Sequence, residues 1–178
     1  MMIHNSSETE HNAVLRVAEA MCVAARTAPK ACGIDLTDTL VLDGEDKDHL
    51  TATMRHIGER DGRSFFIRDA GNVDACHAIV LIGGGTVTRG LNCALCGVPD
   101  CAAAASQGIA CALAVNDVGI ATGSAAALAM DNRVDNRVLF TAGMAALELG
   151  LLGPDVKIAF GIGLYSGGKN IFFDRPAI

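Results

Sequence analysis

The chain has 178 residues and a formal net charge of −6, with 51% hydrophobic and 19% charged residues. This length predicts one domain spanning residues 1–178, and the apolar content excludes intrinsic disorder as a description of the whole chain. The negative charge makes nucleic acid an unfavourable partner, because it repels the phosphate backbone. Six phenylalanines, one tyrosine and no tryptophan also leave few rings on which single-stranded bases could stack.

The elements expected along the chain mix helices with strands. Apolar residues at helical spacing predict an amphipathic helix over 12–28, which Pro29 stops. The remaining elements, in chain order, are a strand over 39–42, a helix over 46–60, a strand over 77–82, a helix over 134–152, a strand over 156–162 and an extended piece over 170–173. The strand over 77–82 runs into Gly83, Gly84 and Gly85, which would either let the backbone approach a bound group closely or form a flexible loop.

The most apolar stretch, 101–130, contains twelve alanines and only one charged residue, Asp117. A membrane span is rejected here, because polar residues at 106–107 and 116–117 interrupt the stretch and its side chains are small rather than bulky. We expect two closely packed helices with a break near Gly108, since glycine is unfavourable inside a helix. Their small apolar surface exceeds what one chain of this length can cover, which predicts a homodimer.

Seven cysteines are more than a cytosolic chain of this size usually carries. The polar start from Met1 to His11 has no basic segment followed by an apolar core, so we expect no secretory signal and a cytoplasmic location. Disulfides then explain the cysteines poorly, because a reducing compartment keeps thiols free. Metal binding or redox chemistry is the better explanation.

Four of the cysteines lie within nineteen residues, in the order Cys93-x2-Cys96-x4-Cys101-x9-Cys111. The first pair places two thiolates on one tight turn. A thiolate set of this kind suits either zinc or an iron-sulfur cluster. Zinc ribbons usually pair two C-x2-C turns and zinc knuckles use a histidine, so neither zinc pattern fits. Structural zinc and free thiols remain as the alternatives to a cluster.

The identity of the fourth ligand depends on the path of the chain between Cys101 and Cys111. On one straight helix these residues would be roughly 15 Å apart along the axis and about 80° apart around it, too far for one compact cluster. A break near Gly108 would bring Cys111 to the cluster. A continuous helix would instead make Cys76, expected beside the Gly83 to Gly85 loop, the better fourth ligand.

The segment NCALCGVPDC resembles the C-x2-C-G-x3-C opening of a four-cysteine iron-sulfur module found in electron-transfer complex subunits and corrinoid proteins. With IATGSAAALAMDNRVDNRVLFTAGMAALELGLLGPDVKIAFGI and GKNIFFDR, most of the chain resembles the uncharacterised ferredoxin-domain-containing protein family of bacteria and archaea. The resemblance implies a [4Fe-4S] cluster in the inserted cysteine segment 93–111. Its ligands would be Cys93, Cys96, Cys101 and Cys111.

A fainter resemblance runs through AARTAPKACGIDLTDTLVLDGED, which is similar to the region of flavin-dependent nitroreductases that meets the isoalloxazine ring. Residues 142–162 resemble the later core of that fold. The resemblance implies an α+β fold, with a mainly antiparallel sheet flanked by helices, and a homodimer with FMN at its interface. The arginine-rich opening that grips the flavin phosphate in that family is missing here. The candidate phosphate and flavin contacts are therefore Arg26, Lys30, Gly33 and Lys169.

Two further patterns can be explained either by structure alone or by a function. Gly163-x4-Gly168-Lys169-Asn170 lacks the hydroxyl residue and the following helix of a phosphate-binding P-loop, so a surface turn is expected. The repeat DNRVDNRV at 131–138 would stack like charges if it were helical. It predicts either a solvated helix junction, a paired-arginine clamp for an anion, or a salt-bridge network across subunits.

The sequence therefore predicts an iron-sulfur redox protein that transfers electrons, in a form that could couple the cluster to a flavin-dependent reduction. A non-catalytic electron carrier and a binding module stabilised by zinc are the competing classes. No general acid, base or nucleophile with an identifiable partner stands out, so the sequence leaves open whether the protein is an oxidoreductase. The redox partner and the substrate are not readable from the sequence.

Overall fold

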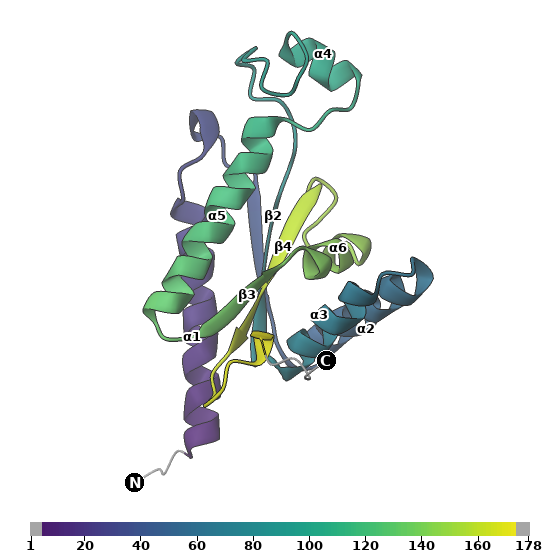
Figure 1. Cartoon of the computed structure of the whole chain (residues 1–178). Helices are drawn as coiled ribbons and strands as arrows, with labels where there is room; N and C mark the ends of the chain where they lie inside the picture. The colour runs from purple at the N-terminus through teal and green to yellow at the C-terminus, as the bar shows by residue number, and fades with distance from the viewer. Residues whose placement is uncertain (1–4, 174–178) are drawn as a thin grey trace.

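The computed structural model describes residues 5–173, in which a four-stranded antiparallel sheet lies between two layers of helices (Figure 1). The strands, in the spatial order β1-β2-β4-β3, are β1 (Thr37–Leu42), β2 (Ala78–Gly84), β3 (Asp135–Leu139) and β4 (Ile158–Tyr165). The helices are α1 (Ser6–Thr27), α2 (Gly44–Arg60), α3 (Ser64–Ala75), α4 (Cys101–Ser106), α5 (Ala112–Asp131) and α6 (Phe140–Glu148). The expected α+β class, with an antiparallel sheet flanked by helices, is confirmed.

Strand β2 lies inside the sheet and all of its residues are buried. Because side chains alternate along a strand, Ile79 and Leu81 enter one core and Val80 and Ile82 enter the other. Helices α1 and α5 cover one face of the sheet, and α2, α3 and α6 cover the other. Burial on both faces explains why the sequence of β2 is continuously apolar.

Glycines allow α6 to lie directly on β4. A Cβ atom at Gly143 would stand 1.8 Å from the carbonyl oxygen of Ala159, and one at Gly161 would stand 2.7 Å from the Cβ of Ala142. Gly163, the first glycine of the P-loop-like pattern, also lies within β4, and no α-helix follows among the described residues. The glycines of this pattern therefore allow close packing in β4 and a turn after it, and the expected surface turn agrees with this.

The prediction of a helix over 134–152 is wrong for the first part of this range. Residues 135–139 form β3, which pairs with β4 at the edge of the sheet, and α6 fills only Phe140–Glu148. The DNRVDNRV repeat consequently runs from the end of α5 through a turn into a strand, where its charges do not stack as on one helix. Backbone pairing with β4 decides this outcome, and the side-chain periodicity of the segment does not contain that information.

The other expected elements are present with shifted ends, and one helix was not expected. The extended piece over 170–173 is instead a single 3₁₀ turn, Ile171–Phe173, whose Phe172 is buried. Helix α3 has no counterpart among the expected elements. Helix α1 begins earlier than expected, because the side chain of Asn5 accepts a hydrogen bond from the Glu8 N–H and caps its first turn.

Helix α5 is, within residues 5–173, the one helix long and apolar enough to cross a membrane by length and composition, with a mean hydropathy of 1.3. In this fold it lies along α1 and over the sheet (Figure 1). Its buried side chains include Asp117, which forms an ion pair with the equally buried Arg89. One face of α5 is therefore part of the core, while the absence of a membrane span and the cytoplasmic location stay predictions.

Candidate metal centre

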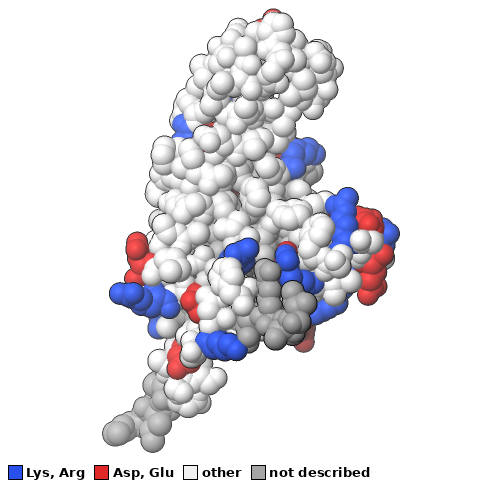
Figure 2. Space-filling view, viewed as in Figure 1, with Lys and Arg blue, Asp and Glu red and all other residues white. Residues whose placement is uncertain are grey.

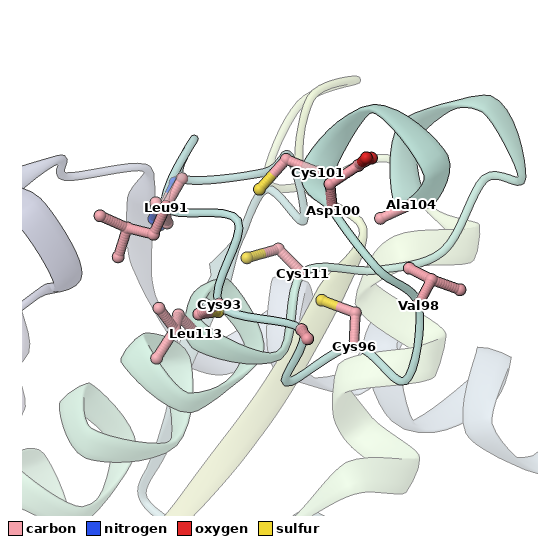
Figure 3. A pocket seen from close by; sticks show the side chains of 11 residues that line it. Leu91, Cys93, Cys96, Val98, Asp100, Cys101, Ala104, Cys111 and Leu113 are labelled. Carbon is pink, nitrogen blue, oxygen red and sulfur yellow. The ribbon is translucent and has the colours of Figure 1, made fainter.

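All four cysteines of the motif line a single cavity in the segment that joins β2 to α5 (Figure 3). The cavity and its opening to solvent together hold about 280 Å³ of space not filled by atoms. In Figure 3 the sulfurs of Cys96, Cys101 and Cys111 face the same enclosed space. They come from the cysteine loop, the first residue of α4 and the residue just before α5. The structure thus gathers the thiols that the sequence spacing singled out.

The loop that carries the first two cysteines contains three residues with positive φ angles, in the left-handed region of backbone conformation. Asn92, Ala94 and Gly97 have φ angles of 48°, 58° and 79°. A turn closes between them, because the N–H of Gly97 donates to the carbonyl oxygen of Ala94 at 3.0 Å. Such φ values reverse the chain over few residues, so that Cys93 and Cys96 line the same cavity.

Backbone N–H groups are directed at two of the sulfurs. The N–H of Asn92 donates to Sγ of Cys101, and the N–H of Ala112 donates to Sγ of Cys96, both at 3.3 Å. The Asn92 side chain also accepts a hydrogen bond from the N–H of Cys101 at 3.0 Å. Donors of this kind favour the anionic form of sulfur, which is the form that binds metal.

The expected break near Gly108 is confirmed. Helix α4 ends at Ser106, Gly108 has a φ of 64°, and α5 starts at Ala112. Cys111 is held at the cavity because its N–H donates to the carbonyl oxygen of Thr86 at 2.9 Å. The chain bends back on itself, so Cys111 lines the same cavity as Cys101.

The thiol of Cys111 has a pKa below its ordinary value. Burial raises this pKa, but four hydrogen bonds lower it by a larger amount. The donors are the backbone N–H groups of Ala114, Arg89 and Leu113 and the Cys96 side chain. Cys111 immediately precedes the first turn of α5, where N–H groups have no partner within the helix. A thiolate is therefore favoured at this corner of the cavity.

Cys76 lies at the opposite end of β2 from the cavity. The seven residues of β2 separate it from the cysteine segment, a span of about 23 Å at the usual rise per strand residue. Its thiol donates to the carbonyl oxygen of Asn72 at 3.2 Å, and burial raises its pKa to about 12. The placement of Cys76 beside the Gly83 to Gly85 loop is therefore wrong, because the whole of β2 lies between them.

The glycines at the end of β2 also differ from expectation. A Cβ atom at Gly83 would stand 2.6 Å from a methyl of Val156, and one at Gly84 would stand 2.7 Å from a methyl of Val118. These residues therefore admit neighbouring side chains of the protein. They do not line the cysteine cavity.

The spacing of the four thiols bears on which metal group they fit. Among residues 5–173, no three His, Cys, Asp or Glu side chains lie close enough to hold one metal ion. A single zinc ion needs its thiolates about 3.8 Å apart, because each Zn–S bond is about 2.3 Å long. A [4Fe-4S] cluster gives each of four cysteines its own iron and spreads them more widely. The cavity, its four thiols and the N–H donors fit the cluster.

Arg89 lines the cavity and forms a buried ion pair with Asp117, a pair that was not identified from the sequence. Nη2 of Arg89 donates to Oδ2 of Asp117 at 2.9 Å, and both side chains are less than 5% exposed. The second carboxylate oxygen of Asp117 accepts from the N–H of Ala31 at 2.9 Å. The one charged residue in the apolar stretch 101–130 was the available signal, because such a charge needs a buried partner.

The four candidate flavin contacts do not meet in one place within the chain. Arg26 pairs with Asp35 at 2.7 Å, and the Lys30 ammonium donates to carbonyl oxygens at the end of α1. Gly33 lies in the 3₁₀ turn Ala31–Gly33 beside them. Lys169 follows β4 and lies at the other end of the sheet, because Leu164 pairs with Ala78 at the start of β2, whereas Thr37 pairs with Gly84 at its end. The flavin contacts stay a prediction.

A larger cavity lies beside Arg26, with about 1090 Å³ of empty space that is open to solvent. Its lining residues come from the segments flanking β1, β2 and β4; they are Arg26, Asp35, Leu36, Thr37, Asp38, Gly85, Thr86, Val87, Asp155, Val156 and Lys157. Thr86 belongs both to this wall and to the hydrogen bond that holds Cys111. The larger cavity and the cysteine cavity are therefore neighbours.

Comparison with known proteins gives a family. Residues 107–175 match a family described as an uncharacterized protein containing a ferredoxin domain. The match includes Cys111 and begins after the other three motif cysteines. A protein from Archaeoglobus fulgidus is 36% identical over 183 residues, covering 98% of each chain. The chain belongs to this family of ferredoxin-domain-containing proteins.

Solved structures give the fold. A BluB-like flavoprotein from Clostridium difficile 630 aligns with a TM-score of 0.59 and 14% identity, over 92% of this chain and 84% of that one. The nitroreductase CinD from Lactococcus lactis, in complex with nicotinic acid, also aligns with a TM-score of 0.59, at 12% identity over 97% and 86% of the two chains. An FMN-dependent nitroreductase from Clostridium difficile R20291 has a TM-score of 0.55 and 12% identity over 86% and 76%. The chain has the nitroreductase fold.

Proposed function

We propose that the protein holds a [4Fe-4S] cluster on Cys93, Cys96, Cys101 and Cys111 and transfers single electrons through it. The observation that carries this proposal is that all four thiols line one cavity into which backbone N–H groups also point. The family's ferredoxin description supports the same role. When bound, the cluster supplies a centre that gains and loses one electron.

The chain's own residues would bind and shield this centre. Apolar side chains of Leu91, Val98 and Leu113 line the cavity between the cysteines and limit the access of water. Leu91 and Leu95 are also 53% and 63% exposed, and Cys93 is exposed beside them. A centre bound here would lie close to the surface, where a redox partner could approach it.

Metal and sulfide analysis of protein purified without oxygen tests the proposal. We expect about four iron and four sulfide per chain after anaerobic reconstitution, with a broad visible absorption that dithionite bleaches. Stoichiometric zinc in a colourless protein would instead support the binding module stabilised by zinc. Protein that retains neither metal would leave the cysteines as free thiols and contradict the proposal.

A flavin-dependent reduction coupled to the cluster is the second candidate function. It is favoured by the shared fold with FMN enzymes and by the larger cavity beside Arg26, which adjoins the cysteine segment at Thr86. Arg26, Lys30, Gly33 and Lys169 are the proposed contacts, contributed by two subunits. Anaerobic titration with FMN, followed by quenching of flavin fluorescence, should show saturable binding that Lys169→Ala weakens. Absence of binding to the unmodified protein would leave the electron carrier.

The proposed homodimer forms through the outer face of α5. The face of the molecule in Figure 2 carries few charged side chains over α5 and the cysteine segment. Between the exposed polar residues Asn116 and Asp131, the exposed residues of this helix are Gly119, Ile120, Gly123, Ala127 and Met130. This part of its outer side is therefore apolar and includes small residues. Small residues let two helices approach closely, and their burial in a second copy would remove apolar surface from water.

A further inference from the structure

Arg89 is a charged side chain enclosed in the wall of the cysteine cavity. Only 3% of its side chain is exposed, and its Nη2 donates to Oδ2 of Asp117. Its Nε and Nη1 are buried and have no hydrogen-bond partner among the described residues. The guanidinium therefore has two unmet donor atoms inside a site lined by four thiols.

Unmet donors of this kind require an explanation. A buried guanidinium loses its hydration, and native proteins replace that hydration with hydrogen bonds to nearly every buried polar atom. Asp117 does not reach these two donors: its Oδ2 accepts from Nη2 of Arg89, and its Oδ1 accepts from the N–H of Ala31 at 2.9 Å. Because Arg89 lines the cysteine cavity, a group bound there can supply the acceptors that its Nε and Nη1 lack.

We infer that Arg89 donates hydrogen bonds from Nε and Nη1 to sulfur atoms of the bound cluster and thereby raises its reduction potential. The inference rests on the proposed cluster at this cavity. Sulfide and thiolate sulfur accept hydrogen bonds, and such bonds set the potentials of iron-sulfur centres. One-electron reduction adds one negative charge to the centre, which a nearby guanidinium stabilises more than the oxidised form.

Asp117 acts through Arg89 as a positioning residue. It is carried by α5, and its two carboxylate oxygens hold the guanidinium on one side and the turn at Ala31 on the other. This arrangement fixes the Arg89 side chain without using its Nε and Nη1. The buried pair thus holds the positively charged end of Arg89 next to the cysteine cavity, where little water is present to screen that charge.

Three variants separate this role from a purely structural one. Arg89→Gln combined with Asp117→Asn removes both charges together, so that no buried charge is left unpaired. Asp117→Asn alone keeps the guanidinium and removes the neighbouring negative charge. Arg89→Lys keeps the positive charge and its partner but lacks the Nε donor. Each full-length protein is reconstituted anaerobically, and its iron, sulfide and circular dichroism are compared with the wild type.

The readout is the midpoint potential, measured by dithionite titration with redox mediators. For the double variant we expect the ratio of reduced to oxidised cluster at a fixed potential to fall on the order of tenfold, which is about 59 mV for one electron. Asp117→Asn should leave the potential unchanged or raise it. A double variant with a full cluster and the wild-type potential would overturn the inference, as would an equal fall in Asp117→Asn.

If the double variant holds no iron, the midpoint potential of Arg89→Lys tests the inference instead. A potential below the wild type supports the contact from Nε, and an unchanged potential overturns it. Wild-type protein that takes up no iron and sulfide would contradict the proposed function and this inference together. A wild-type protein with a full cluster, beside variants whose potentials do not move, would contradict this inference alone.

Discussion

The backbone N–H of Cys111 donates a 2.9 Å hydrogen bond to the carbonyl oxygen of Thr86. This bond ties the last cysteine of the motif to the point where the chain leaves β2, twenty-five residues earlier in the sequence. The segment between them is therefore closed into a loop whose two ends meet at the cysteine cavity. The sheet, through β2, positions the motif cysteines, which lie outside it.

This closure predicts which cysteines hold iron. Each of Cys93→Ser, Cys96→Ser, Cys101→Ser and Cys111→Ser should lower iron and sulfide per chain strongly after anaerobic reconstitution, because each removes one of four thiolates. Cys76→Ser is the matched control, since Cys76 lies at the other end of β2. Full iron in Cys111→Ser together with loss in Cys76→Ser would show that the fourth ligand is misassigned.

The proposed dimer can be tested at Gly123 without disturbing the chain itself. A Cβ atom at Gly123 meets nothing within 4 Å, so Gly123→Leu should fold normally while its side chain blocks a second copy of α5. We expect a shift from dimer to monomer in light scattering at low micromolar concentration. Gly71→Leu on α3 is the control, because Gly71 is also helical, exposed and free of contacts. A monomeric wild-type protein would contradict the proposal.

The close approach of α6 and β4 predicts a large loss of stability for Gly143→Ala. The new methyl would stand 1.8 Å from the carbonyl oxygen of Ala159, so the helix must move away from the strand. We expect the free energy of unfolding to fall by about 3 kcal/mol, measured by urea denaturation. Gly71→Ala, by contrast, should raise it by about 0.5–1 kcal/mol, because alanine favours helix and meets no neighbour there. Equal effects at the two sites would show that α6 does not pack on β4 as described.

The buried thiol of Cys76 predicts a stability change at alkaline pH. Its pKa is raised by burial from 9.0 to about 12, so the folded protein keeps this proton more tightly than the unfolded chain does. The stabilisation is complete below about pH 9 and is lost as pH rises toward 12, at up to about 1.4 kcal/mol per pH unit. Urea denaturation of the apoprotein from pH 8 to 11 should show a steeper decline for the wild type than for Cys76→Ala. Parallel declines would contradict the burial of this thiol.

Local signals in the sequence determined much of this protein. The cysteine spacing identified the four residues that line one cavity, and Gly108 marked the break between α4 and α5, because glycine interrupts helices wherever it stands. The apolar run of β2 and the periodicity of α1 indicated a mixture of strands and helices, and the resemblance to flavin-dependent nitroreductases implied the α+β class. These features depend on residues close together in the chain, which is why sequence alone could read them.

Contacts between distant segments were decided only by the tertiary structure. Residues 135–139 became a strand because the edge of β4 offers backbone partners, although their periodicity favoured a helix. Cys76 is excluded as a candidate ligand because the whole length of β2 separates it from the cysteine segment. The pairing of Arg89 with Asp117 joins residues twenty-eight positions apart, and it matters because burial strips both charges of water. Neither pairing nor burial is written in local sequence pattern, since both depend on which segments the folded chain brings together.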